Sequence, residues 1–323
     1  MKVQCELCPK SCVLEPGQSG ECRVRINIDG VLRTVVYGFP CSVHNDPVEK
    51  KPLFHFLPGT RIISIATVGC NLHCKNCQNW EISQANPEES PAFAMPPEKL
   101  VEVTLAAGCP SIAYTYTDPI VYYEYTLDTA KLARQKGIRN VLVTAGYINP
   151  QPWRRLLEYI DAANIDLKGI TEEFYRTVCS ATLKPVQDAL VIAKASGVLV
   201  EVTNLIIPTL NDRPEDIRKL VRWVKANLGA ETPLHFSRFF PRYKMRHLPA
   251  TSAATLDMAR DIAANEGMEY VYIGNIASKT GSNTYCPKCK KLLIERVVYR
   301  ILQNRISGGC CPDCGYQIYG VWQ

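Results

Sequence analysis

Three closely spaced cysteines, Cys70, Cys74 and Cys77, form the part of this sequence with the clearest chemistry. The loop that carries this cysteine triad is short enough to place three thiolates on three irons of a 4Fe-4S cluster, whereas a cluster held by protein alone needs a fourth cysteine. One iron is therefore left open to chelate a small molecule. A zinc knuckle with a distant fourth ligand, such as His73 or another cysteine, is the alternative interpretation.

The residues on both sides of the triad favour the cluster over the zinc knuckle. The isoleucine- and valine-rich run 61–68 predicts a buried strand, and Gly69 allows the chain to turn directly before Cys70. Trp80 follows the last cysteine and is expected to shield one side of the cluster from water. We therefore expect a strand that delivers three iron ligands at its carboxyl end.

A second group of cysteines, the N-terminal quartet, consists of Cys5, Cys8, Cys12 and Cys22. Four thiols in a segment too small to bury a core indicate that a bound metal supplies the folding energy. Structural zinc is the first expectation and an auxiliary iron-sulfur cluster the second, because both kinds of site take four thiolates. A β-hairpin over residues 24–37 and a proline-rich linker complete this predicted N-terminal domain, residues 1–59.

A third group, the C-terminal quartet, is made of two Cys-x-x-Cys pairs, Cys286 with Cys289 and Cys311 with Cys314. This pattern is typical of a zinc ribbon, and the β-branched stretch between the pairs predicts a hairpin over residues 292–301. Zinc is the expected metal, and rubredoxin-like iron is the alternative. We therefore expect a C-terminal zinc-ribbon domain over residues 279–323.

Strand-like and helix-like segments alternate between these two cysteine-rich ends, which predicts an α/β fold with a parallel sheet. The helix over residues 214–228 is the clearest, because its apolar residues recur at helical spacing behind Asp212 and Pro214. About six or seven strand-helix units follow from residue 61, fewer than the eight of a closed barrel. We therefore expect a partial (β/α)6-type barrel over residues 60–278.

Ligands of such sheets bind at the carboxyl ends of the strands, so the polar residues at the ends of the predicted strands are candidate binding residues. They are Tyr114, Thr115, Tyr116, Asp118, Thr144, Asp166, Lys168, Thr203, His235 and Arg238. The two-residue spacing of Asp166 and Lys168 places both side chains on one face, where they contact a ligand or form an ordinary ion pair. By the same spacing, Tyr114 and Tyr116 share a face and either contact the ligand or pack.

The composition is that of a globular enzyme: 323 residues, 46% of them hydrophobic, with a net charge of +6 and no block of like charges. This charge permits contact with nucleic acid or an acidic partner and requires neither. Fifteen cysteines without a secretory signal indicate metal ligands in a reducing cytoplasm. Lys194 interrupts the best apolar run, between residues 189 and 202, so we expect no contact with a membrane.

The cysteine triad resembles the signature of the radical S-adenosylmethionine (SAM) superfamily. This resemblance implies that SAM binds the open iron and that one electron from the cluster cleaves it to a 5'-deoxyadenosyl radical. It also implies an electron donor such as ferredoxin or flavodoxin, and a SAM contact near residues 114–118. The sequence departs from the superfamily pattern at Asp118-Pro119, where relatives commonly have Asn-Glu-Pro, and at Ala145, where asparagine is usual.

Longer sequence segments resemble one branch of the superfamily, the AmmeMemoRadiSam-system radical SAM enzymes. They are residues 46–56, 69–83, 114–116, 166–168 and 235–241, so the similarity covers essentially the whole chain. This resemblance implies that Memo-like and AMMECR-like proteins are candidate partners.

More distantly, the sequence is similar to the pyruvate formate-lyase activating enzymes. In those enzymes the aspartate and lysine of an Asp-x-Lys motif and a later histidine line the SAM site. The resemblance implies these roles for Asp166, Lys168 and His235, with Asp166 helping to hold a cation and Thr144 beside that cation.

We therefore expect a radical SAM enzyme that abstracts hydrogen from an unidentified, macromolecular substrate. Kinship with the activating enzymes implies a protein glycine as the target, whereas the ribbon, the net positive charge and the tyrosines are compatible with an RNA-modifying enzyme as an alternative. A noncatalytic metal scaffold in a complex of Memo-like and AMMECR-like proteins is the alternative outside the enzymes.

Overall fold

The computed structural model describes residues 1–276 and 281–323. Its centre is a sheet of eight strands in the order β12-β11-β10-β9-β8-β7-β6-β5. Strands β6 to β12 run parallel to their neighbours, and β5 pairs antiparallel with β6. The α/β fold with a central parallel sheet is therefore confirmed. The strands are β5 Ser42–Pro47, β6 Arg61–Ala66, β7 Ser111–Tyr114, β8 Arg139–Thr144, β9 Ala162–Asp166, β10 Leu199–Ile206, β11 Leu234–Arg238 and β12 Val271–Gly274.

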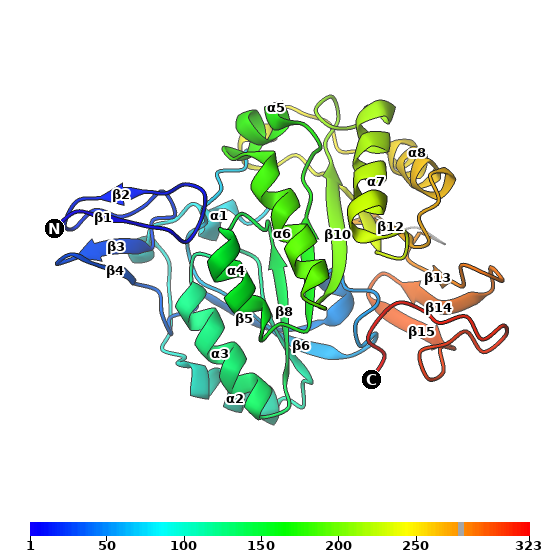
Figure 1. Cartoon of the computed structure of the whole chain (residues 1–323), viewed down its shortest axis with the longest axis horizontal. Helices are drawn as coiled ribbons and strands as arrows, with labels where there is room; N and C mark the ends of the chain where they lie inside the picture. Colours follow the sequence, from blue (N-terminus) through cyan, green and yellow to red (C-terminus); the bar gives the residue numbers. More distant parts are fainter. Residues whose placement is uncertain (277–280) are drawn as a thin grey trace.

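Helices connect the parallel strands and pack side by side over one face of the sheet (Figure 1). Helix α7 shows why, because its five leucine, isoleucine and valine residues, such as Ile217 and Val221, are buried and form one stripe. Among the described residues, no helix has both the length and the apolar character needed to cross a membrane. The helices are α1 Trp80–Ser83, α2 Pro97–Ala106, α3 Tyr123–Gln135, α4 Pro150–Leu157, α5 Glu172–Phe174, α6 Leu183–Ala195, α7 Pro214–Leu228 and α8 Ala253–Asn265.

The amino ends of the strands are closed by two segments from outside the strand-helix series. Apolar side chains of residues 48–57 pack against the first residues of the strands, together with Tyr319 and Val321 from the end of the chain. The backbones of the two segments are hydrogen-bonded, with 2.7 Å from the Val321 nitrogen to the His55 oxygen. A ligand therefore has to approach the sheet from its carboxyl end.

The predicted N-terminal domain contributes directly to the sheet. Strand β5 lies within residues 1–59, yet it pairs with β6 from Ser42 opposite Ala66 to Pro47 opposite Arg61. The sheet therefore continues across the predicted boundary at residue 59, whereas the predicted boundary at 278 lies outside the described residues. The predicted hairpin is present, with Asp29 at φ 51° in its turn. The remaining N-terminal strands are β1 Val3–Gln4, β2 Val13–Leu14, β3 Arg25–Ile28 and β4 Val31–Thr34.

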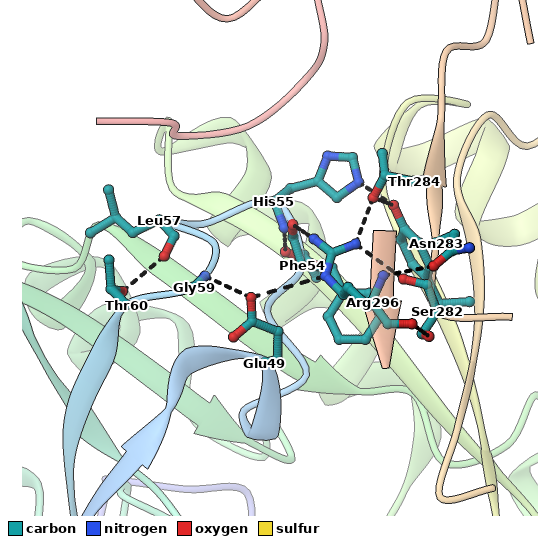
Figure 2. Close-up of polar contacts among 12 residues, drawn as sticks. Glu49, Phe54, His55, Leu57, Gly59, Thr60, Ser282, Asn283, Thr284 and Arg296 are labelled. Atoms are coloured by element: carbon teal, nitrogen blue, oxygen red, sulfur yellow. Dashed lines mark hydrogen bonds and ion pairs between the residues drawn. The ribbon is translucent and has the colours of Figure 1, made fainter. Parts of the chain in front are cut away.

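The C-terminal strands form a small antiparallel sheet at the opposite end of the molecule from β1 to β4 (Figure 1). Arg296 joins this sheet to the rest of the fold (Figure 2). Its buried guanidinium donates to the Phe54 carbonyl at 2.7 Å and to the Thr284 hydroxyl at 2.8 Å, and lies 4.0 Å from Glu49. Because a buried cation needs such partners, Arg296 fixes the position of the small sheet. Its strands are β13 Thr284–Tyr285, β14 Leu292–Val297 and β15 Arg300–Asn304.

Candidate functional site

A cavity of about 340 Å³ lies at the carboxyl ends of the parallel strands. Its volume is within the range of about 300 to 1,000 Å³ that is usual for small-molecule sites. The cavity brings together residues that follow different strands, as expected for this kind of sheet. Of the residues singled out from the sequence, those that line it are Cys70, Cys74, Cys77, Thr115, Tyr116, Asp118, Thr144, Asp166, Lys168 and Thr203.

The cysteine triad occupies the loop directly after β6. Gly69 makes the turn with φ 91°, a left-handed conformation that glycine adopts without strain. The Leu72 amide lies 3.4 Å from the Cys70 sulfur, and the Cys77 sulfur lies 3.2 Å from the Ser83 hydroxyl. Burial raises the pKa of Cys70 and of Cys77. A bound metal is therefore needed to make these thiols thiolates.

A fourth cysteine, which sequence reasoning missed, lies next to the triad. A side-chain hydrogen bond between Cys74 and Cys179, together with burial, raises the pKa of Cys74 well above its usual value. The Cys179 carbonyl also accepts from the His73 amide at 3.1 Å, and the Lys75 amide donates to Val178 at 2.9 Å. Cys179 is fully buried, whereas the triad lines the cavity, so this thiol supports the loop from behind.

Asp118 organises the part of the cavity where the sequence departs from the superfamily pattern. Its buried carboxylate accepts hydrogen bonds of 2.9 Å from the Thr144 hydroxyl and of 2.9 Å from the Ala145 amide. Burial raises the pKa of Asp118 in spite of these donors. Asp118 therefore holds the loop after β8 in place. Both of its carboxylate oxygens already accept these hydrogen bonds.

Asp166 and Lys168 form an ion pair on the cavity wall at the end of β9, with 2.6 Å between Nζ and the carboxylate. Burial lowers the pKa of Lys168, but the negative charge of Asp166 outweighs it and this pKa is raised well above its usual value. Lys168 is therefore a fixed cation beside the triad. The ion pair expected as one alternative is therefore present, and both of its side chains also line the cavity, where a ligand can reach them.

A second cationic group, also missed from the sequence, comes from the segment after β5. Lys51 is almost completely buried and lies 2.7 Å from the Asp46 carboxylate, which also accepts a hydrogen bond from the Tyr116 hydroxyl. Burial lowers the pKa of Lys51 to about 8, against the raising effect of Asp46. Lys50 and Lys51 both line the cavity, so two lysines contribute to its wall at the edge of the sheet. The Lys-Lys pair within residues 46–56 was the only sequence signal for them.

Three buried polar atoms, each on a residue that lines the cavity, have no hydrogen-bond partner within the described part of the chain. They are Oδ1 of Asn76, Oδ1 of Asn164 and Oγ1 of Thr203. Because a buried polar atom without a partner is costly, these atoms indicate a ligand with hydrogen-bond donors. SAM fits this requirement, since its amino, ribose and adenine groups all carry donors.

Tyr114 lies outside the cavity although it was a candidate SAM contact. Strand β7 ends at Tyr114, and the chain then turns at Tyr116, where φ is 63°. The alternation that would place the two tyrosines on one face therefore stops before Tyr116. Tyr114 is fully buried and donates to Asn140 at 3.1 Å.

His235 and Arg238 also lie away from the cavity wall. His235 is near the amino end of β11, and its Nε2 lies 2.6 Å from the buried Glu201 carboxylate. This position is closer to the closed end of the sheet than that of Ser237, which lines the cavity. Arg238 lies over the ring of Phe240, 5.0 Å from its centre. His235 is thus buried against Glu201 and Arg238 packs on Phe240, whereas both were expected to contact a ligand.

The C-terminal quartet forms a compact group suited to a single metal ion. The ligand atoms of Cys286, Cys289, Cys311 and Cys314 all lie within 4.8 Å of one another. Zinc bonds to sulfur are about 2.3 Å long, and a tetrahedron of that size places its sulfurs about 3.8 Å apart. The Sγ to Sγ distances of 3.6 Å between Cys286 and Cys314 and 3.7 Å between Cys289 and Cys311 match it.

Comparisons with known proteins relate this chain to radical SAM proteins. A family model described as "Radical SAM superfamily" matches residues 64–224. An uncharacterized protein of Methanocaldococcus jannaschii is 49% identical over 98% of this chain and 95% of its own. The pyruvate formate-lyase-activating enzyme of Clostridium pasteurianum is 27% identical over 52% of this chain and 71% of its own. The crystal structure of Streptococcus suis SuiB bound to precursor peptide SuiA has a similar fold, with a TM-score of 0.54 and 12% identity over 71% of this chain and 51% of SuiB.

Proposed function

The chain belongs to the radical SAM superfamily, and we propose that it is an enzyme that cleaves SAM in the cavity at the carboxyl ends of β6 to β12. When bound, a 4Fe-4S cluster supplies the electron that converts SAM to methionine and a 5'-deoxyadenosyl radical. The radical then takes a hydrogen atom from a second substrate. In this proposal the sheet is a partial barrel, whose open carboxyl end admits that substrate.

One observation carries the proposal: the cysteine triad and a set of buried, unpartnered polar atoms line the same cavity. Cys70, Cys74 and Cys77 line the cavity and would hold a 4Fe-4S cluster by three of its irons, so that the fourth would be free to bind SAM. The Lys168 ammonium, which lines the cavity, would pair with the SAM carboxylate. Asn164 and Thr203 accept hydrogen bonds from the donors of SAM.

The proposal is tested by product formation in the absence of oxygen. Protein reconstituted with iron and sulfide and reduced with dithionite, which replaces a ferredoxin or flavodoxin donor, is expected to convert SAM to 5'-deoxyadenosine. Cys74→Ala is expected to abolish this product, whereas Cys109→Ala, which removes a buried cysteine remote from the cavity wall, is the matched control. Equal product from Cys74→Ala and the parent would refute the proposal.

A protein glycine is the candidate hydrogen donor that the comparisons favour. The supporting observation is the similarity to activating enzymes of pyruvate formate-lyase and of 4-hydroxyphenylacetate decarboxylase, each over about half of this chain. Incubation with a pyruvate formate-lyase-type protein and SAM is expected to give a glycyl radical, detected by electron paramagnetic resonance. Uncoupled 5'-deoxyadenosine without that radical signal would exclude this substrate and leave SAM cleavage intact.

A further inference from the structure

The N-terminal quartet surrounds one narrow cavity of about 20 Å³. Strands β1 and β2 bring its first members together, with 2.8 Å from the Cys5 amide to the Cys12 carbonyl. All four thiols are free. Apolar side chains, including Leu14, Ile120 and Val121, contribute to the wall, and Cys5, Cys8 and Cys22 are buried while Cys12 is partly exposed. The four thiols are therefore already gathered around one cavity and do not lie in an unstructured segment.

The spacing of its sulfurs differs from that of the C-terminal quartet. In the described residues, the C-terminal quartet is the one group of three or more cysteine, histidine or carboxylate ligands compact enough for a single ion. The N-terminal quartet is more widely spaced, and a cavity of about 20 Å³ exceeds the roughly 10 to 15 Å³ that a water molecule needs. A tetrahedral zinc site has no such space, because its sulfurs are in contact across the metal.

The cysteine triad provides an internal comparison. Its three sulfurs line one cavity and are likewise too far apart to form a compact group for one ion, as expected when each sulfur binds a different iron. The N-terminal quartet therefore resembles the triad and not the ribbon. We propose that the quartet holds a second 4Fe-4S cluster, with all four irons ligated by protein. This inference does not depend on SAM cleavage.

The surroundings of the quartet suit an anionic cluster. The Arg25 guanidinium contacts the Cys5 sulfur while it forms hydrogen bonds of 2.7 and 2.8 Å to the Glu124 carboxylate. Backbone amides of Lys10 and Val24 donate to sulfurs of the quartet. Such hydrogen bonds to sulfur stabilise a cluster and set its potential.

The proposed cluster site is adjacent to the triad. Asn71, which follows the first triad cysteine, reaches into the N-terminal cavity and contacts Cys8. A Cβ atom on Gly69 would lie 2.5 Å from the Cys22 carbonyl oxygen, so the two cysteine segments are in direct contact there. The two clusters would therefore share a wall, and their unpaired electrons would interact after reduction.

Metal analysis of the full chain, purified or reconstituted without oxygen, tests the inference. The proposal predicts about eight irons, about eight sulfides and one zinc per chain, since each cluster contributes four irons. Four irons and two zincs would overturn it, even if the same protein forms 5'-deoxyadenosine. In that case the proposed function would survive and this inference would not.

Two variants assign the iron to its site. The triple variant Cys70→Ala, Cys74→Ala, Cys77→Ala is expected to retain about four irons and the spectrum of a reducible cluster. The double variant Cys8→Ala, Cys22→Ala is expected to lose about four irons and to keep the ribbon zinc, which also reports that the chain has folded. Reduced parent protein should show a spin-coupled resonance that both variants lack. A triple variant without iron, but with normal zinc, would contradict the proposal.

Discussion

The side chains of Cys179 and Cys74 are hydrogen-bonded to each other although the two residues lie far apart in the sequence. A Cys74 thiolate that ligates iron can only accept, so Cys179 would then donate, and a hydrogen bond to a ligand sulfur stabilises the more negative, reduced cluster. Such a bond to a charged acceptor contributes about 1.5 kcal/mol, or about 60 mV for a one-electron couple. Cys179 therefore adjusts the proposed cluster without being one of its three predicted ligands.

Replacing Cys179 should change the reduction potential of the cluster. We expect Cys179→Ala to bind iron normally and to titrate at a potential about 60 mV more negative than that of the parent. Cys179→Ser, which keeps a donor, should restore most of the difference, and Cys109→Ala should have no effect. Redox titration followed by electron paramagnetic resonance measures the shift, and equal potentials for Cys179→Ala and the parent would exclude this role.

Removing the Lys168 charge should weaken SAM binding. A charge-assisted hydrogen bond contributes about 1.5 to 3 kcal/mol, so Lys168→Met is expected to raise the dissociation constant about 10- to 100-fold. Lys99→Met removes the cation of an exposed pair with Glu102, 3.0 Å long, and is the matched control. Anaerobic calorimetry on reconstituted protein gives both constants. An unchanged affinity in Lys168→Met would show that SAM does not use this cation.

A methyl group on Gly69 should disturb both cysteine segments at once. Gly69 and Gly137 have similar positive φ angles, 91° and 74°, so alanine at either position costs about 1 to 2 kcal/mol of stability from backbone strain. Only at Gly69 would the Cβ also meet the Cys22 carbonyl, whereas at Gly137 it meets no atom within 4 Å. We expect Gly69→Ala to lose more stability and more iron than Gly137→Ala, measured by urea unfolding and iron analysis. Equal losses would argue against a tight contact at Gly69.

The C-terminal quartet should bind one metal ion that stabilises the ribbon. Cys311→Ser is expected to lose one zinc per chain and to expose the small sheet to proteolysis, because metal binding and folding of such domains are coupled. Cys310→Ser changes the neighbouring cysteine, which is outside the compact group, and should keep the zinc. Metal analysis together with limited proteolysis distinguishes the two variants. Loss of zinc from Cys310→Ser alone would reverse the assignment.

His55 should make the stability of the protein depend on pH. Its Nδ1 lies 2.5 Å from the Tyr319 carbonyl and its Nε2 lies 2.6 Å from the Tyr272 hydroxyl. Since a carbonyl only accepts, Nδ1 carries the proton and Nε2 accepts from Tyr272, so the ring is neutral. Burial lowers the pKa of His55 to about 4. Protonation would therefore place a second proton on Nε2, which conflicts with the proton that Tyr272 donates to it, and would put a charge in a buried site.

The sign of this dependence follows from the lowered pKa. Between about pH 6.5 and pH 4 the unfolded chain binds the proton that the folded chain excludes, so stability is complete above pH 6.5 and falls as the pH decreases toward 4. The loss contributed by His55 at pH 5 is about 2 kcal/mol. Urea unfolding at pH 7.5 and pH 5 should show a smaller pH effect in His55→Gln than in the parent. Parallel losses in the two proteins would assign the effect to other groups.

The features that the sequence determined are those set by short-range spacing. The triad follows a buried strand and a glycine turn, helix α7 buries the stripe that its period predicts, and Asp29-Gly30 makes the hairpin turn. Backbone geometry relates neighbours along the chain in the same way in every protein. Such features can therefore be deduced before any long-range contact is known.

The tertiary structure alone decided which distant side chains share an environment. It placed Cys179 behind Cys74, buried Lys51 beside Tyr116, and placed His235 against Glu201 at the closed end of the sheet. It also gave the two four-cysteine sites different distances between their sulfurs, because these distances depend on how whole segments pack. Residue types and their order specify which ligands are present. Only packing across the sheet specifies which of them meet, and at what distance, since burial and long-range contacts involve residues that the local pattern does not relate.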